Sequence, residues 1–271
     1  MKKTRIGIVG CGAIGSSLAR SVVRDFSRNS ALSALCDVDA GKAIDLSRKL
    51  GKKIPVVSLA RLINMSDLVI ESAHARFSAQ IARAALKKKR DVMVMSVGGL
   101  VGKIDKIKSL ALKAGSKVYI PSGAISGIDA VKAASMGKIR TATLTTTKNP
   151  RAFKGVRYVE AKFPLLDKIK KPVVLFCGPA KEAVKYFPQN INVAAVLSLA
   201  GIGAGKTIVR IIASQAVNKN IHEVSVEAQA GNIATRTENI LHPENPKTSF
   251  LAVLSAQAVL KQILEPVKIG T

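Results

Sequence analysis

The stretch that decides the fold lies near the start of the chain: Thr4-Arg5-Ile6-Gly7-Ile8-Val9-Gly10-Cys11-Gly12-Ala13-Ile14-Gly15. A mostly apolar run over 4–9 is typical of a buried strand, and the segment from Ser16 to Phe26 is helical in pattern. Between them stands G-x-G-x-x-G, in which the first glycine allows a tight turn, the second admits a pyrophosphate and the third lets helix and strand pack closely. The helix N-terminus adds N–H groups and a positive dipole end. We therefore expect a dinucleotide to contact five residues of this turn: Gly10, Gly12, Ala13, Ile14 and Gly15.

Asp37 supports the same interpretation. It ends a second strand-like run, Ala31–Cys36, about 22 residues past Gly15, where an acidic ribose-binding residue is expected. Its carboxylate can accept hydrogen bonds from the adenosine ribose and would repel a 2′-phosphate. The prediction is NAD as cofactor, with NADP possible. The alternative is a glycine turn in a sheet that binds nothing.

The rest of the chain shows two patterns of strand-like and helical segments, one on each side of Pro121. Strand-like runs alternate with helical segments up to Pro121, which predicts an α/β doubly wound parallel sheet of Rossmann type over 1–121. The strand-like runs after the first two are 67–71, 91–95 and 117–120, and the helical segments are 78–89 and 104–114.

Beyond Pro121 the pattern becomes that of an α+β domain, 122–245, with a mostly antiparallel sheet and a catalytic and dimerisation role. Ile139–Thr147 alternates apolar residues with threonines, as a half-exposed antiparallel strand does. Two further runs are expected to form a hairpin around a Gly231-Asn232 turn. The remaining strands are expected at 173–176 and 207–212, and the helices at 181–187 and 190–200. Helical periodicity from Thr248 to Leu264 predicts a C-terminal helix within 246–271 that returns to the first domain.

Composition limits the classes of function. The 271 residues include 43 Lys and Arg against 17 Asp and Glu, a net charge of +26, which favours anionic partners. Aromatic residues make up only 4%, and the cations are spread along the chain, so a general compositional bias is favoured over nucleic-acid binding as the source of the charge. No apolar run reaches the ~18 residues of a membrane helix. The three cysteines form no C-x-x-C pair, which favours a cytoplasmic, reducing location and no metal site.

A second glycine-rich segment, Ala200–Thr207, nearly matches the phosphate loop G-x-x-x-x-G-K-[ST]. A helical run precedes it and a strand-like run follows, which is the reverse of what a phosphate loop requires. We interpret it as a helix C-cap and turn and expect no ATP there.

Among the three histidines, His222 begins a strand and shares a face with Val224 and Val226. This position fits two roles equally well. His222 is either a core histidine whose ring nitrogens have hydrogen-bond partners, or a general acid–base, since the unperturbed pKa of imidazole is near neutral. His74 follows the third strand and is expected to be a solvated loop residue. His242 opens a polar cluster that either positions a substrate or precedes a helix capped by Thr248 or Ser249.

The chain as a whole resembles the archaeal-type L-aspartate dehydrogenases. Besides the glycine turn, the resemblance rests on five later motifs in order: Ile120-Pro121-Ser122-Gly123-Ala124-Ile125, Thr146-Thr147-Lys148-Asn149, Phe187-Pro188-Gln189-Asn190-Ile191-Asn192-Val193-Ala194-Ala195, Asn220-Ile221-His222-Glu223 and Glu244-Asn245-Pro246-Lys247-Thr248-Ser249-Phe250. It implies NAD(P)-dependent oxidative deamination of L-aspartate to iminosuccinate, which hydrolyses to oxaloacetate and ammonia or feeds NAD biosynthesis. It also implies that His222 is the active-site residue and that Ala124 and Asn192 contact the cofactor.

Basic side chains would hold the two carboxylates of such a substrate, with Lys148, Arg151 and Lys247 as candidates. The exposed face of the second sheet suggests a homodimer. One alternative is a Rossmann-type dehydrogenase or reductase acting on another small anionic substrate. Another is a non-enzymatic, NAD-sensing module that binds nucleic acid.

Overall fold

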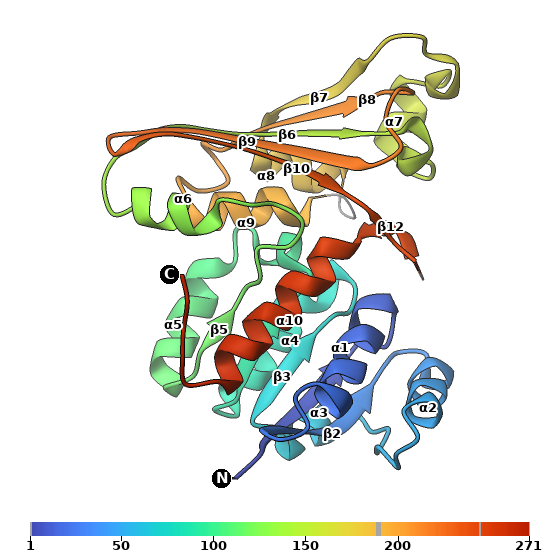
Figure 1. The fold of residues 1–271 in the computed structure, drawn as a ribbon, viewed down its shortest axis with the longest axis vertical. Coiled ribbons are helices and arrows are strands. Elements are labelled where there is room, and N and C mark those ends of the chain that lie inside the picture. The colour runs from blue at the N-terminus through green and yellow to red at the C-terminus, as the bar shows by residue number, and fades with distance from the viewer. Residues whose placement is uncertain (1, 188–190, 244, 271) are drawn as a thin grey trace. The chain divides into compact units, whose positions relative to one another are not determined.

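The computed structural model describes residues 2–187, 191–243 and 245–270, without the side chains at 245–247. Its contacts divide the chain into two compact units (Figure 1). Unit 1 contains the residues up to Pro121 together with Val253–Ile269, and unit 2 contains Ser122–Ala252 and Gly270. The C-terminal helical segment from Val253 onward therefore belongs with the N-terminal unit.

Unit 1 is a Rossmann-type unit around a five-stranded sheet in the order β2-β1-β3-β4-β5. Every neighbouring pair of strands is parallel, which confirms the predicted α/β class. The strands are β1 (Thr4–Val9), β2 (Ser30–Cys36), β3 (Leu68–Glu71), β4 (Asp91–Val94) and β5 (Val118–Tyr119). The helices are α1 (Ala13–Arg24), α2 (Ala40–Lys49), α3 (Leu59–Met65), α4 (Ala75–Lys87), the 3₁₀ helix η1 (Val97–Leu100), α5 (Ile104–Ala114) and α10 (Phe250–Leu264).

Separate apolar clusters cover the two faces of this sheet because successive strand residues point to opposite sides. One cluster includes Ile6 and Ile8 with Leu18 of α1 and with Ala256 and Leu260 of α10. The other includes Val9 and side chains of α3, α4 and α5. Helix α10 thus covers the same face as α1.

Unit 2 is built on a second five-stranded sheet in the order β10-β9-β6-β8-β7. Its strands are β6 (Ile139–Lys148), β7 (Val173–Pro179), β8 (Ile208–Ala213), β9 (Asn220–Ala228) and β10 (Gly231–Asn239). The remaining elements are α6 (Ile128–Ala134), η2 (Pro150–Phe153), α7 (Arg157–Lys162), η3 (Leu166–Lys168), α8 (Ala180–Tyr186), α9 (Asn192–Ala200) and a two-stranded ribbon of β11 (Leu241–His242) and β12 (Asn245–Ser249).

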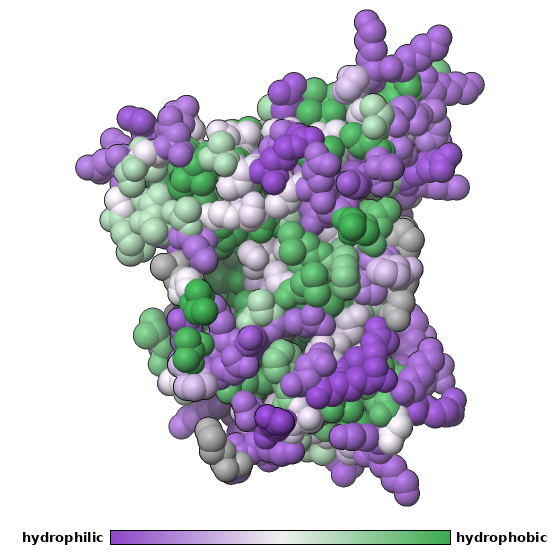
Figure 2. Space-filling view, viewed as in Figure 1, coloured by the Kyte–Doolittle hydropathy of each residue, from purple (hydrophilic) through white to green (hydrophobic). Residues whose placement is uncertain are grey.

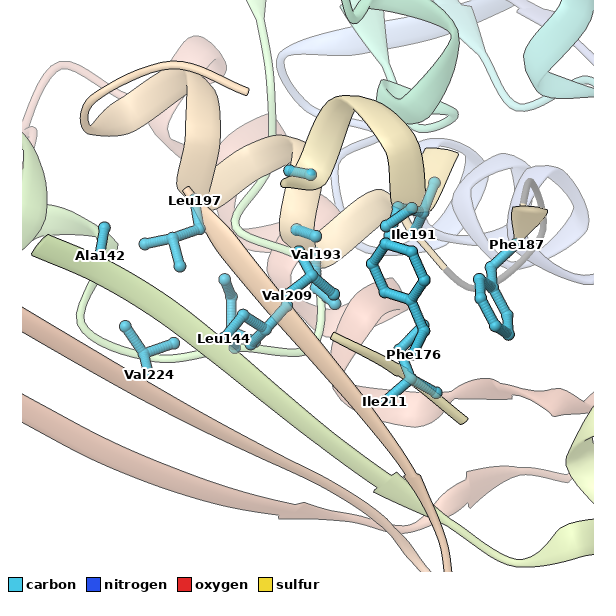
Figure 3. Close-up of a cluster of buried hydrophobic side chains, with 14 of the residues drawn as sticks. Ala142, Leu144, Phe176, Phe187, Ile191, Val193, Leu197, Val209, Ile211 and Val224 are labelled. Carbon is cyan, nitrogen blue, oxygen red and sulfur yellow. The ribbon is translucent and has the colours of Figure 1, made fainter. Parts of the chain in front are cut away.

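Helices α8 and α9 lie against one face of the second sheet (Figure 1). Figure 3 shows Leu144 of β6 and Val224 of β9 directed toward Val193 and Leu197 of α9, within one buried cluster. The mostly antiparallel sheet is confirmed, although β6 runs parallel to β8 and antiparallel to β9.

Three details of the sequence prediction are corrected. The hairpin turn is Gln229-Ala230 and not Gly231-Asn232, because Ala228 pairs with Gly231 in the ladder. The segment 241–249 forms the ribbon of β11 and β12, so helix α10 begins at Phe250, two residues later than the predicted start at Thr248. In the helix predicted over 190–200, Asn190 lies outside the described residues and the helix begins at Asn192.

Four short helices were not detected in the sequence pattern, because a helix of ten residues or fewer is shorter than the window over which helical periodicity is recognised. They are α2, α3, α6 and α7. None of the helices in the described parts of the chain is long and apolar enough to cross a bilayer.

Candidate functional site

The glycine turn after β1 has the geometry that its sequence predicts. Gly10 adopts φ +95°, and a Cβ there would lie 2.5 Å from the backbone of Ser72. A Cβ on Gly15 would lie 1.9 Å from the carbonyl oxygen of Gly10, so this close approach of helix and turn requires glycine. At Gly12 a Cβ would meet nothing within 4 Å. Open space beside that backbone is what a bound pyrophosphate needs.

Helix α1 begins directly after this turn. Gly12 is its N-cap residue and supplies no side-chain cap, so the first turn of α1, with Ala13 and Ile14, presents its N–H groups to whatever occupies the space. Such an end attracts anions. The residues present therefore fit a dinucleotide phosphate.

The carboxylate of Asp37 lies beside the turn and helps to shape it. Its Oδ2 accepts a hydrogen bond of 2.6 Å from the backbone N–H of Cys11, and its Oδ1 accepts one of 2.9 Å from the backbone N–H of Asp39. Asp37 is half-buried, and the next residue, Val38, is 95% exposed. The carboxylate therefore connects the end of β2 to the glycine turn and is partly exposed.

Glu71, the last residue of β3, is an ionisable group of unit 1 that sequence reasoning missed. Its carboxylate is fully buried and accepts backbone hydrogen bonds from Ala73 (2.8 Å) and Ser96 (3.2 Å). Burial raises the pKa of Glu71 from 4.5 to about 7, although the two backbone donors oppose the shift. Glu71 thus fixes the loops after β3 and β4 at the carboxyl edge of the sheet, where ligands bind in this fold.

In unit 2, backbone and helix contacts bring the motif residues Ala124 and Asn192 into the same region. Gly123 adopts φ +71°, and a Cβ there would lie 3.6 Å from Val193, in the first turn of α9 beside Asn192. The carbonyl oxygen of Ala124 accepts hydrogen bonds of 3.0 Å from Thr237 Oγ1 and from Asn239 Nδ2. The loop that carries Ala124 is therefore attached to β10.

His222 lies at the end of the inner face of the sheet, where that face changes from apolar to polar. It is 3% exposed, and the register pairs it with Thr146 on β6 and Thr237 on β10. Nδ1 of His222 and Oγ1 of Thr146 share a hydrogen bond of 2.9 Å. Val224 and Val226 share the face of His222, as predicted, and are buried.

Two more polar side chains, Asn220 and Lys148, continue this face toward the strand ends. Asn220 Nδ2 donates to Ser249 Oγ at 3.2 Å. Lys148, the last residue of β6, is 5% exposed. We call His222, Thr146, Lys148, Asn220 and Asn239 the polar cluster of unit 2.

The electrostatics of this cluster correct one expectation. Burial, together with the positive charge of Lys148, lowers the pKa of His222 to about 3, and burial lowers the pKa of Lys148 to about 8. The near-neutral pKa cited for the general acid–base alternative is therefore not the pKa of His222 in this structure. At pH 7 His222 is neutral, which is the form that accepts a proton.

The structure places the other highlighted residues elsewhere. His74 is the N-cap of α4, where its Nδ1 accepts a weak hydrogen bond of 3.3 Å from the backbone N–H of Arg76. His242 is 4% exposed and packs edge-to-face on Phe250. Arg151 is exposed. The side chain of Lys247 lies outside the described residues, as do motif residues 188–190 and 244.

The segment Ala200–Thr207 connects α9 to β8, as expected for a turn and not for a phosphate loop. Burial raises the pKa of Cys11 to about 12, so this thiol is protonated and unreactive. The described residues hold no group of three or more His, Cys, Asp or Glu that could bind a metal.

Comparisons with known proteins agree with this geometry. A family model described as aspartate dehydrogenase, C-terminal, matches residues 129–263, and one described as homoserine dehydrogenase, NAD binding domain, matches residues 10–121. The L-aspartate dehydrogenase of Methanosarcina barkeri is 45% identical over 270 residues, which cover 98% of this chain and 99% of that protein. The corresponding protein of Nitrosopumilus maritimus is 37% identical over 272 residues, with the same coverage.

The fold has a counterpart among solved structures. The crystal structure of aspartate dehydrogenase from Thermotoga maritima matches with a TM-score of 0.72 at 23% identity, covering 99% of this chain and 100% of that one. Fold and site define an NAD(P)-dependent oxidoreductase with a Rossmann unit and a second α+β unit. The chain belongs to the L-aspartate dehydrogenase family.

Proposed function

We propose that this protein catalyses the oxidative deamination of L-aspartate by NAD(P)+, giving iminosuccinate, which hydrolyses to oxaloacetate and ammonia. The observation that carries the proposal is His222. It is a buried, neutral imidazole anchored by Thr146 at the polar end of the sheet. The resemblance of the Asn220-Ile221-His222-Glu223 motif to that of the family supports an active-site role for it.

The cofactor would be held by the glycine turn, with Gly10, Gly12, Ala13, Ile14 and Gly15 around the phosphates. Asp37 would accept hydrogen bonds from the adenosine ribose, and Ala124 and Asn192 are proposed as further contacts. When bound, the cofactor supplies the hydride acceptor. The space at Gly12 and the uncapped start of α1 support this placement. Asp37 supports a preference for NAD over NADP.

His222 is the proposed general base. Oxidation of the substrate ammonium form to a protonated imine removes one hydride from Cα and one proton from nitrogen. The imidazole takes that proton and releases it to solvent. The neutral ring then accepts a proton from the water molecule that attacks the imine carbon. Thr146 fixes the ring through Nδ1, which leaves Nε2 to exchange the proton.

Three further proposals concern setting and assembly. The product imine would feed NAD biosynthesis. The free cysteines, of which Cys177 is exposed, support a reducing, cytoplasmic location. The outer face of the second sheet, with exposed Ser225, Glu227 and Arg236, supports a homodimer in which a second copy covers that face.

The test is the growth of the reduced-nicotinamide absorbance with NAD+ and L-aspartate, beside parallel reactions with NADP+, L-glutamate, L-alanine and L-malate. His222→Asn should lower kcat by a factor on the order of 10²–10⁴, the usual contribution of a general base. NADH affinity, measured by fluorescence, should be unchanged.

His74→Asn is the matched control, since the side chain of His74 caps α4 through the backbone N–H of Arg76 and asparagine also caps helices well. A wild-type protein that oxidises malate or glutamate but not aspartate would refute the substrate assignment. Full activity of His222→Asn would refute the role of His222.

A further inference from the structure

Lys148 stands out among the cations because it is buried. The Lys and Arg side chains of a protein are almost never fully buried unless an anion or an equivalent partner compensates them. Among the buried polar residues that the structure describes, Lys148 is the one Lys or Arg, at 5% exposure. Its burial distinguishes Lys148 from the solvated cations of the described chain.

The position of Lys148 relates it to His222. It lies two residues after Thr146 on β6, so both side chains point to the inner face of the sheet, and Thr146 is bonded to the imidazole at 2.9 Å. The ladder places Lys148 opposite Ala213 of β8, a side chain of one methyl group. The long lysine therefore lies beside a small neighbour at the polar end of this face. Its charge is close enough to the imidazole to contribute to the lowered pKa of His222.

We propose that Lys148 is a substrate-binding residue, whose ammonium group binds a carboxylate of the dicarboxylate substrate next to His222. The inference rests on the proposed function in that it takes L-aspartate as the substrate. A desolvated ammonium binds a carboxylate more strongly than an exposed one does, because the low local dielectric strengthens the attraction. None of the exposed cations of the described chain has this advantage.

The same contact couples substrate binding to catalysis. A carboxylate at Lys148 offsets the positive charge beside the imidazole, so His222 becomes a stronger base when substrate is present. By thermodynamic linkage, protonation of His222 and binding of the carboxylate then favour each other. Lys148 would thus contribute both to affinity and to the activation of the base.

The test compares Lys148→Met and Lys148→Gln with Lys148→Arg, which keeps the charge, and with Lys154→Met as the matched control. Lys154 is exposed and six residues away, so its substitution makes the same change in net charge outside the cluster. Two readouts are measured on the protein saturated with NADH or NAD+: the Kd of succinate by calorimetry and the KM and kcat for L-aspartate. Glutamine keeps a polar side chain at this position, so it carries the test if the methionine variant does not fold.

We expect the neutral variants to raise the Kd of succinate and the KM for aspartate at least tenfold, with NADH affinity unchanged. Lys148→Arg should recover most of the succinate affinity, and Lys154→Met should match the wild type. Succinate affinity within twofold of wild type in a folded neutral variant, or a loss confined to kcat, would overturn the inference.

The two proposals fail separately. A wild type that binds succinate through Lys148 but does not oxidise aspartate would refute the proposed function and leave the carboxylate site. If the wild type oxidises aspartate and the neutral variants have an unchanged KM, the role of Lys148 is refuted and the proposed function stands. A wild type that neither binds succinate nor oxidises aspartate would refute both.

Discussion

Asp37 provides the sharpest test of the cofactor site, because one substitution changes its charge and keeps its shape. Asp37→Asn replaces one carboxylate oxygen by an amide nitrogen. Both oxygens of Asp37 accept backbone hydrogen bonds, from Cys11 and from Asp39. The variant can keep only one of these bonds, so it loosens the turn as well as removing the charge.

The magnitude follows from the ribose contact proposed for Asp37. A hydrogen bond to a charged acceptor contributes ~1.5–3 kcal/mol, and a neutral one ~0.5–1.5 kcal/mol. The loss is therefore about 1–2 kcal/mol for each ribose hydroxyl that Asp37 accepts, or about 5–30-fold in the Kd of NADH. For NADPH, the Asp37→Asn substitution is expected to lower the Kd. A 2′-phosphate about 5 Å from a carboxylate is repelled by roughly 3 kcal/mol at an effective dielectric of about 20, and the Asp37→Asn substitution removes that repulsion.

The assay is the quenching of protein fluorescence, or the enhancement of nicotinamide fluorescence, on titration with NADH and NADPH. Asp39→Asn is the control, since Asp39 is exposed and caps α2 through Gly41, and asparagine caps helices as well as aspartate does. We expect Asp37→Asn to weaken NADH binding about tenfold, to strengthen NADPH binding, and to leave the Tm within a few degrees of wild type.

The reasoning fails if Asp37→Asn and Asp39→Asn change the two affinities alike, because general electrostatics of this basic surface would then explain the effect. It also fails if NADH and NADPH weaken by the same factor in Asp37→Asn. That result would mean that the residue only shapes the turn and does not face the ribose.

Three further outcomes are expected. The pKa of Glu71 is raised to about 7 in the folded protein from 4.5 unfolded, so ionisation is more costly in the native state, and stability is lost as pH rises from about 4.5 to 7. The upper bound is on the order of 3 kcal/mol at ~1.4 kcal/mol per pH unit. Chemical unfolding between pH 5 and pH 8 should show a slope that Glu71→Gln lacks, and coincident slopes would contradict this reasoning. Gly15→Ala places a methyl group against the Gly10 carbonyl oxygen, so NADH affinity should fall by more than tenfold in a titration; wild-type affinity would show that the turn relaxes without cost. Thr146→Val removes the bond to His222 and should lower kcat about tenfold with KM nearly unchanged in steady-state kinetics, whereas an unaltered kcat would mean that packing alone orients the ring.

The Rossmann unit could be predicted from the sequence because its signals are local. The apolar run before Gly10, the spacing of the glycines and the position of Asp37 are all readable within 40 residues, and the structure has each of them in the expected geometry. The hairpin of unit 2 was placed correctly but its turn was not. Gly231 is a strong turn residue, yet the ladder pairs Ala228 with Gly231, so the register and not the local preference sets the turn.

The polar cluster was harder to predict, because its members meet only through the pairing of distant strands. Thr146 and His222 are 76 residues apart in sequence. Thr146 is one of several threonines that alternate along β6, and nothing local separates it from Thr143 or Thr145. The signal that could have found it is the burial pattern. The inner face of β6 changes from Ala142 and Leu144 to Thr146 and Lys148, and such a change from apolar to polar marks the edge of a core.

The charge of the chain indicates function less well than the burial of its charges does. A net charge of +26 favours anionic partners in general and does not distinguish one class from another. In the structure hydrophilic side chains dominate the surface of the end of unit 2 that carries α7 (Figure 2), where exposed lysines are solvated, weakly paired and uninformative about a ligand. Two charged side chains of the described residues are buried: Glu71, which fixes the loops beside the glycine turn, and Lys148, which lies in the cluster of His222. Because burial of a charge costs stability that folding alone does not return, these two positions are where selection for activity is expected to act.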